Sequence, residues 1–223
     1  MSFLDDLKRQ AEATRAQQTT DEHALERNAG LTDMACKAAS NYFAQLVQQL
    51  NVLKPRSKVT YRLDRTQRFS DLPLVDFRAD TRQKRLRGAE VCDHVVMRWR
   101  LASHRPLAVT KNFVPDIDSL EARLRRGGVK FEAHEVRHPE TAKLQEMRYE
   151  FVADFNASVL VTPDHATARL RFELVNLDGF ETVTVEFPAF EVGAKRLDDL
   201  AHWVLGEPNQ FLKDGQNLRR VEA

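Results

Sequence analysis

The chain has 223 residues, 42% of them hydrophobic and 30% charged, which is enough to bury a sizeable core. With eight Gly and eight Pro, the composition excludes collagen-like, low-complexity and largely disordered chains. The net charge is +1, but the charges are unevenly distributed along the chain. Residues 54–130 carry 19 basic and 9 acidic side chains, whereas the rest of the chain carries 15 basic and 24 acidic side chains. This division predicts contacts between oppositely charged faces, within one chain or between chains.

The first 30 residues predict a polar helical arm. Residues 2–28 contain neither Gly nor Pro, and apolar residues follow a helical period for only two turns, at Phe3, Leu4, Leu7 and Ala11. The stretch beyond Ala13 is nearly all polar, so such a helix has little to bury, and Gly30 is expected to end it. We therefore interpret residues 1–30 as an oligomerisation arm.

A second helix is expected from Asp33 to Leu53, with Thr32 or Asp33 as its N-cap and the Lys54-Pro55 step as its end. An apolar stripe marks it as a core helix, formed by Met34, Ala38, Phe43, Leu46, Val47, Leu50 and Leu53.

The period of the apolar residues then changes to two, which is typical of strands with one covered face. Strands are expected near residues 59–63, 75–79, 95–101 and 107–113, before a helix over 116–126 that Gly127-Gly128 ends. Further strands are expected near residues 129–133, 147–161, 168–174 and 183–187, before a helix over 194–205 and a polar, irregular tail over 207–223. The sequence thus predicts an α+β fold with N-terminal helices followed by two β4α-like units, 54–128 and 129–206. Residues 31–206 are expected to form a single domain. Its sheet should be curved, mainly antiparallel and covered by helices.

One string resembles a metal site, because residues 134–138 read His-Glu-Val-Arg-His, the spacing of zinc-dependent hydrolases. That chemistry needs both histidines on one helical turn, whereas the preceding alternation predicts a strand and Pro139 follows at once. In a strand, His134 and His138 stand about 13 Å apart, too far to share one ion. We therefore expect no metal and no other cofactor, and keep a zinc hydrolase as a distant alternative.

Five basic side chains form the densest candidate binding site, between two predicted strands: Arg78, Arg82, Lys84, Arg85 and Arg87. At or near a hairpin tip they would present positive charge to an anion or an acidic protein surface. The alternative is a solvated tip that keeps edge strands from pairing. Nucleic acid is a less favoured partner, since the aromatic residues alternate into the predicted core.

Five aromatic residues form the other candidate site, an apolar cavity between the sheet and the C-terminal helix: Trp99, Tyr149, Phe151, Phe155 and Phe172. Such a cavity would suit a small-molecule carrier, although core packing is the default role of these residues.

No nucleophile motif or phosphate-binding loop is present, and no pair of carboxylates stands out, so no catalytic residue is assigned. The two cysteines, Cys36 and Cys92, are too few for a disulfide framework and are interpreted as packing thiols. The chain begins without the apolar core of a signal peptide and contains no apolar run of about 18 residues, so a cytoplasmic location is expected. The sequence favours a non-enzymatic assembly protein, a homo-oligomer that uses charged surfaces and does not bind membranes.

Overall fold

The computed structural model describes residues 3–222, and the side chains of residues 3–6, 13 and 15–20 lie outside the described part. Its first element is one helix, α1 (Phe3–Leu53), where the sequence predicted two. Gly30 lies inside this helix, and Thr32 does not cap it but bonds backward from Oγ1 to Asn28 O (3.1 Å) and Ala29 O (3.0 Å). The two predicted helices are therefore continuous, because an isolated Gly costs a long helix only about 1 kcal/mol.

Nine strands follow in the described chain, and seven of them form one antiparallel sheet. Their bounds are β1 (Tyr61–Arg62), β2 (Arg68–Phe69), β3 (Leu74–Leu86), β4 (Ala89–Lys111), β5 (Phe131–Arg137), β6 (Leu144–Asp164), β7 (Arg169–Val175), β8 (Glu181–Pro188) and β9 (Gln216–Glu222). The sheet order is β3-β4-β6-β7-β8-β9, with β5 pairing along the first part of β6. The α+β class and the mainly antiparallel sheet are as predicted.

The strands β1 to β4 precede α2 (Val114–Arg126), and β5 to β8 lie between α2 and α3 (Ala194–Val204). A short 3-10 turn, η1 (Ala189–Glu191), comes directly before α3. The predicted strands 95–101 and 107–113 form one strand, β4, and β2 was not predicted, so the agreement in number does not extend to the individual strands. In addition, β1 and β2 pair only with each other, whereas β5 to β8 all belong to the main sheet. The two halves thus differ in strand pairing, and the β4α-like units are not confirmed as a repeat.

The C-terminal tail is not irregular as predicted, because β9 adds to the edge of β8. Phe211, just before it, is fully buried against Phe172, Phe187 and Trp203. Every residue of β9 is exposed, so no apolar alternation marks this strand in the sequence.

The helices cover one face of the sheet. Along β6, odd-numbered residues from Tyr149 to Pro163 are buried, while the even-numbered residues between them are exposed or half-buried. Side chains of α1 are buried against this face from Thr32 onward, and α2 joins it where Tyr149 donates to Glu121 (2.8 Å). Within residues 3–222, no helix covers the other face, which is called the open face below.

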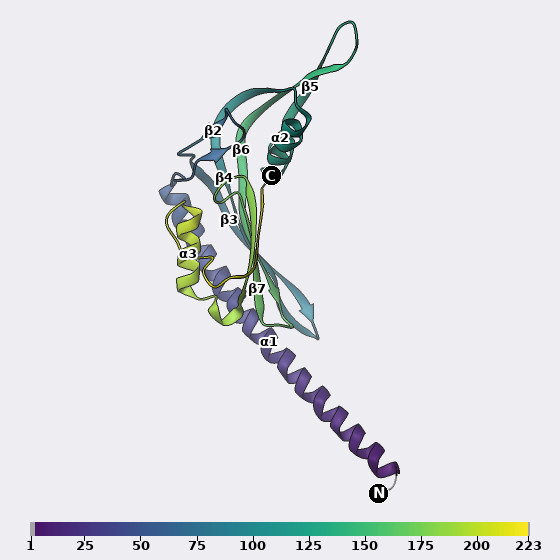
Figure 1. The fold of residues 1–223 in the computed structure, drawn as a ribbon. Coiled ribbons are helices and arrows are strands. Elements are labelled where there is room, and N and C mark those ends of the chain that lie inside the picture. Colours follow the sequence, from purple (N-terminus) through teal and green to yellow (C-terminus); the bar gives the residue numbers. More distant parts are fainter. Residues whose placement is uncertain (1–2, 223) are drawn as a thin grey trace.

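The N-terminal half of α1 continues beyond the end of the sheet, as Figure 1 shows. Among its described side chains, none between residues 7 and 30 is buried. Within residues 3–222, no helix has the combined length and apolar character that crossing a membrane requires.

Candidate functional site on the open face of the sheet

The predicted basic cluster lies on the β3–β4 hairpin. A two-residue turn at Arg87 (φ 50°) and Gly88 (φ 86°) joins the strands, as expected for a hairpin whose two central residues have positive φ. All five basic side chains are exposed. In the described chain, Lys84 is the one member of the five that forms an ion pair, because its Nζ lies 3.2 Å from Asp93 Oδ1.

Strand register brings Arg98, which the sequence analysis did not single out, next to this cluster. Arg78 on β3 lies directly opposite Arg98 on β4, and Arg98 in turn lies opposite Ser158 on the open face of β6. Arg82 lies on the same face, opposite His94. We call Arg78, Arg82 and Arg98 the open-face arginine cluster.

The cluster is poorly neutralised. Within the described chain, none of its three guanidinium groups forms an ion pair within 4.0 Å, although Asp80 lies between Arg78 and Arg82 on β3. The Asp80 carboxylate instead accepts the backbone N–H of Thr81 (2.9 Å). Like charges directly opposite each other destabilise an antiparallel pair, so the Arg78–Arg98 register costs folding free energy. Such a local conflict is typical of a functional surface.

A β-bulge sets this register. Between the pairs Val75↔Arg100 and Arg78↔Arg98, β3 advances by three residues and β4 by two, and Asp76 in the bulge has φ 58°. The extra residue turns Phe77 to the covered face, where its ring stacks on Trp99 with centroids 5.6 Å apart. Without the bulge, Phe77 instead of Arg78 would pair with Arg98.

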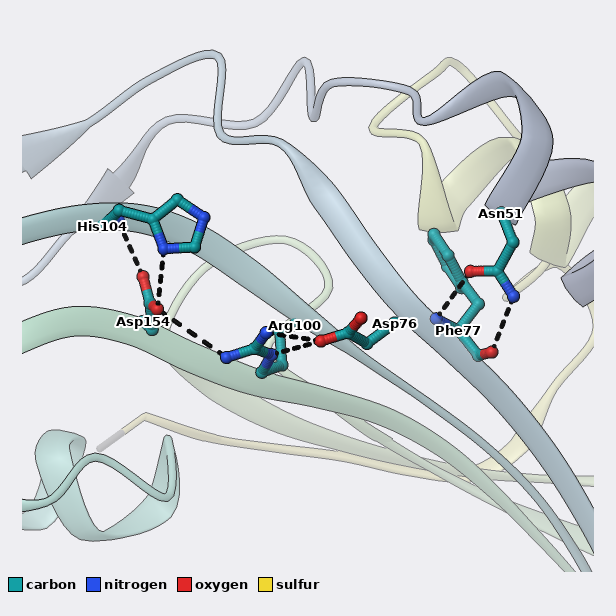
Figure 2. A network of polar contacts seen from close by, with 6 residues as sticks. All are labelled: Asn51, Asp76, Phe77, Arg100, His104 and Asp154. Carbon is teal, nitrogen blue, oxygen red and sulfur yellow. Dashed lines mark hydrogen bonds and ion pairs between the residues drawn. The ribbon is translucent and has the colours of Figure 1, made fainter.

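The helix α1 holds the bulge in place. Figure 2 shows the Asn51 amide beside the backbone of Phe77, where Nδ2 donates to Phe77 O (2.9 Å) and Phe77 N donates to Oδ1 (3.0 Å). The amide thereby satisfies both polar backbone groups of a residue in the bulge.

Arg100 is fully neutralised, unlike the open-face arginine cluster. Its Nε donates to Asp76 (2.8 Å) and its Nη1 lies 3.8 Å from Asp154, which also accepts the backbone N–H of His104 (2.8 Å; Figure 2). His104 has φ 53° in a bulge of β4 between Ala102 and Pro106. The bulge in β3 thus places Asp76 beside Arg100, and Asp154 approaches Arg100 from β6. In the described chain, no carboxylate forms an ion pair with the neighbouring Arg98.

The predicted aromatic cavity residues belong to the hydrophobic core. Trp99, Tyr149, Phe151, Phe155 and Phe172 are at most 6% exposed. Their rings contact other core rings, among them Phe155 with Phe69 and Phe172 with Phe187. This packing does not favour a carrier that binds its ligand among these side chains.

The His-Glu-Val-Arg-His string lies mainly in a strand, as predicted, with His138 just beyond its end. His134 is in β5, beside Glu132 (3.6 Å), whereas the ring of His138 accepts the backbone N–H of Glu140 (3.2 Å) in the turn after it. Within residues 3–222, no group of three or more Asp, Glu, His or Cys side chains is arranged to hold a metal ion.

A groove of about 720 Å³ lies between α1, the hairpin tip and the β6–β7 turn. Lys84 and Arg87 line it from the hairpin, and Ala29 and Gly30 line it from α1. His165 lies at its buried side, where Nδ1 is 2.6 Å from Thr32 Oγ1 and Nε2 is 2.7 Å from Cys92 O. No sequence signal indicated that these three elements would meet.

Comparisons with known proteins give no further guide: no family model matches the chain, and neither curated proteins nor solved structures show a significant match. The function is therefore inferred from the geometry of the chain alone.

Proposed function

We propose that this protein is a non-enzymatic interaction protein that binds acidic segments of other proteins on the open face of its sheet. The Arg78–Arg98 pair carries the proposal, because two exposed arginines face each other across neighbouring strands and neither forms an ion pair with a carboxylate of the described chain. A bound carboxylate would replace their repulsion with charge-assisted hydrogen bonds.

The chemistry of the surface favours carboxylates over nucleic acid. Guanidinium groups bind carboxylates and phosphates alike through two parallel hydrogen bonds, so the distinction rests on the neighbouring side chains. Arg82 extends the positive surface toward the hairpin tip. Binding of single-stranded nucleic acid usually adds exposed aromatic rings. Between Arg78 and Arg82, the open face instead presents Asp80, opposite the aliphatic side chain of Val96.

The projecting part of α1 supports assembly as a second component of this function. Every described side chain between residues 7 and 23 is exposed. A helix that buries so little is only marginally stable in water, so we propose that this segment packs against a second copy of the chain. Deleting residues 1–24 should preserve cooperative unfolding and lower the mass measured by light scattering. Loss of folding, or an unchanged mass, would contradict this part of the proposal.

The binding surface can be tested with a fluorescently labelled oligoglutamate peptide and the full-length protein. The double variant Arg78→Glu/Arg98→Glu should lower the affinity measured by anisotropy at least about tenfold, equivalent to about 1.4 kcal/mol. The wild-type affinity should fall as salt rises toward about 1 M, where screening acts within about 3 Å.

The matched control for the single change Arg98→Glu is Lys195→Glu on α3, because each reverses one exposed positive charge and Lys195 lies on the helical side of the protein. Its affinity should stay within about twofold of wild type if location matters more than net charge. Equal losses in both variants would contradict the proposal. Tighter binding of a single-stranded oligonucleotide than of oligoglutamate would replace the acidic protein partner with nucleic acid.

A further inference from the structure

The chain's two cysteines meet in the core, although they lie far apart in the sequence. Cys36 is on α1 and Cys92 is on β4, and they are 1% and 3% exposed. The two thiols lie so close that each is the group with the largest effect on the pKa of the other. Neither cysteine takes part in the open-face arginine cluster.

Other contacts independently fix the position of α1 against Cys92. Asp33, one turn before Cys36, accepts the backbone N–H of Cys92 (3.2 Å). From the same turn of the helix, Thr32 contacts the ring of His165 (2.6 Å), which contacts Cys92 O (2.7 Å). Backbone and side-chain bonds therefore hold the helix face that bears Cys36 over Cys92.

We infer that Cys36 and Cys92 form a redox site in which a small hydroperoxide converts two buried thiols into one disulfide between α1 and β4. The groove of about 720 Å³ offers a route, because Asp33, Val91 and His165, the neighbours of these cysteines, line it. A thiol pair that the fold holds side by side forms a disulfide within the chain more readily than one between chains.

The reaction balances with hydrogen peroxide as the oxidant. The Cys92 thiolate attacks one peroxide oxygen, so that an S–O bond forms, the O–O bond breaks and hydroxide leaves with the former thiol proton as water. The Cys36 sulfur then attacks the oxidised sulfur, an S–S bond forms, and the hydroxyl group leaves as a second water with the proton of Cys36. Two thiols lose two electrons, and one peroxide is reduced to two waters.

The electrostatics of the pair agree with these roles. The neighbouring Cys36 thiol, whose effect outweighs that of burial, lowers the pKa of the Cys92 thiol. The neighbouring Cys92 thiol and then burial raise the pKa of the Cys36 thiol. Cys92 is therefore the first nucleophile and Cys36 the resolving thiol.

The experiment treats the folded, full-length protein with hydrogen peroxide and then counts thiols after denaturation. We expect both thiols to disappear, the monomer mass to fall by two hydrogen atoms, and a reductant to restore both. The melting temperature should rise on oxidation, because a disulfide that closes a long loop restricts the unfolded chain. Cys36→Ser should instead stop at a singly oxidised Cys92 and show no such rise.

A parallel oxidation in urea separates a native site from chance pairing during unfolding. The inference is wrong if the disulfide forms only in urea, if it joins two chains, or if the folded protein keeps both thiols. Because Cys36→Ser also changes packing, Cys36→Ala provides a second variant, and it too should give no intramolecular disulfide.

Discussion

Asp64 is nearly buried and accepts four hydrogen bonds. Its donors are Gln67 N (2.6 Å), Thr66 N (2.7 Å), Lys111 Nζ (2.8 Å) and Thr66 Oγ1 (2.9 Å). Burial by itself raises the pKa of the carboxyl group, but these bonds outweigh it and hold the pKa at about 2. The carboxylate thus stabilises the fold in its charged form.

Asp64 should make the free energy of unfolding depend on acid pH. Because its pKa is depressed in the folded state, its contribution is fully present above about pH 4 and is lost as pH falls toward 2. The loss amounts to about 2 kcal/mol, for a side chain that is only 9% exposed. Urea unfolding at several pH values should show a shallower acid dependence for Asp64→Asn than for wild type. The exposed Asp71→Asn should retain the wild-type slope, and an equal slope in Asp64→Asn would contradict the assignment.

Asn51 should contribute more to the free energy of unfolding than an ordinary surface amide, because both its polar atoms form hydrogen bonds with the backbone of Phe77 in the bulge. Asn51→Ala leaves two partly buried backbone groups without partners and should lower the free energy of unfolding by about 1–3 kcal/mol. Amide hydrogen exchange should accelerate near Phe77. Ser40→Ala removes an exposed contact between the same two elements, to Thr81, and should cost less than about 0.5 kcal/mol. Equal effects of the two changes would argue against a special role for Asn51.

The sequence allowed two of the three arginines of the open-face cluster to be predicted. Arg78 and Arg82 stand out because basic residues are dense there, and the hairpin follows from the turn and the alternation on each side. Arg98 could not be predicted, because its position opposite Arg78 depends on a bulge that shifts register by one residue. That bulge depends in turn on Asn51, which is distant in the sequence.

At the scale of elements, most strands and the two shorter helices were predictable, because one covered face imposes a regular apolar period. Two errors have local causes. Gly30 suggested a helix end, yet tertiary contacts from Thr32 onward and good helix formers before it keep α1 continuous. The exposed β9 has no apolar period and is identified only by its pairing with β8.

Gly30 is an exposed residue inside the continuous helix α1. A Cβ at this position would have no heavy atom within 4 Å, so Gly30→Ala should raise the free energy of unfolding by about 0.5–1 kcal/mol through helix propensity. Gly128→Ala should do the opposite, because Gly128 has φ 64° and a Cβ there would lie 2.1 Å from Asn156 Nδ2. Urea unfolding of both variants tests this contrast. A destabilising Gly30→Ala would contradict a continuous, unstrained α1.

For the whole molecule, the uneven charge distribution has a structural counterpart. The excess of basic residues in 54–130 includes the hairpin strands β3 and β4, and helices cover only the opposite face of their sheet. The surface that carries the open-face arginine cluster is therefore left available to a partner. The fold tolerates the repulsion between Arg78 and Arg98, and we propose that binding relieves it.

Urea unfolding of wild type and Arg98→Gln, each with and without saturating oligoglutamate, tests this central claim most directly. A ligand that binds only the folded state raises its stability, so the peptide should raise the wild-type midpoint. Without peptide, Arg98→Gln should unfold at an equal or higher urea concentration than wild type, since one like charge is removed, and peptide should leave its midpoint nearly unchanged. A variant that is less stable alone, or that peptide stabilises as much as wild type, would contradict the account.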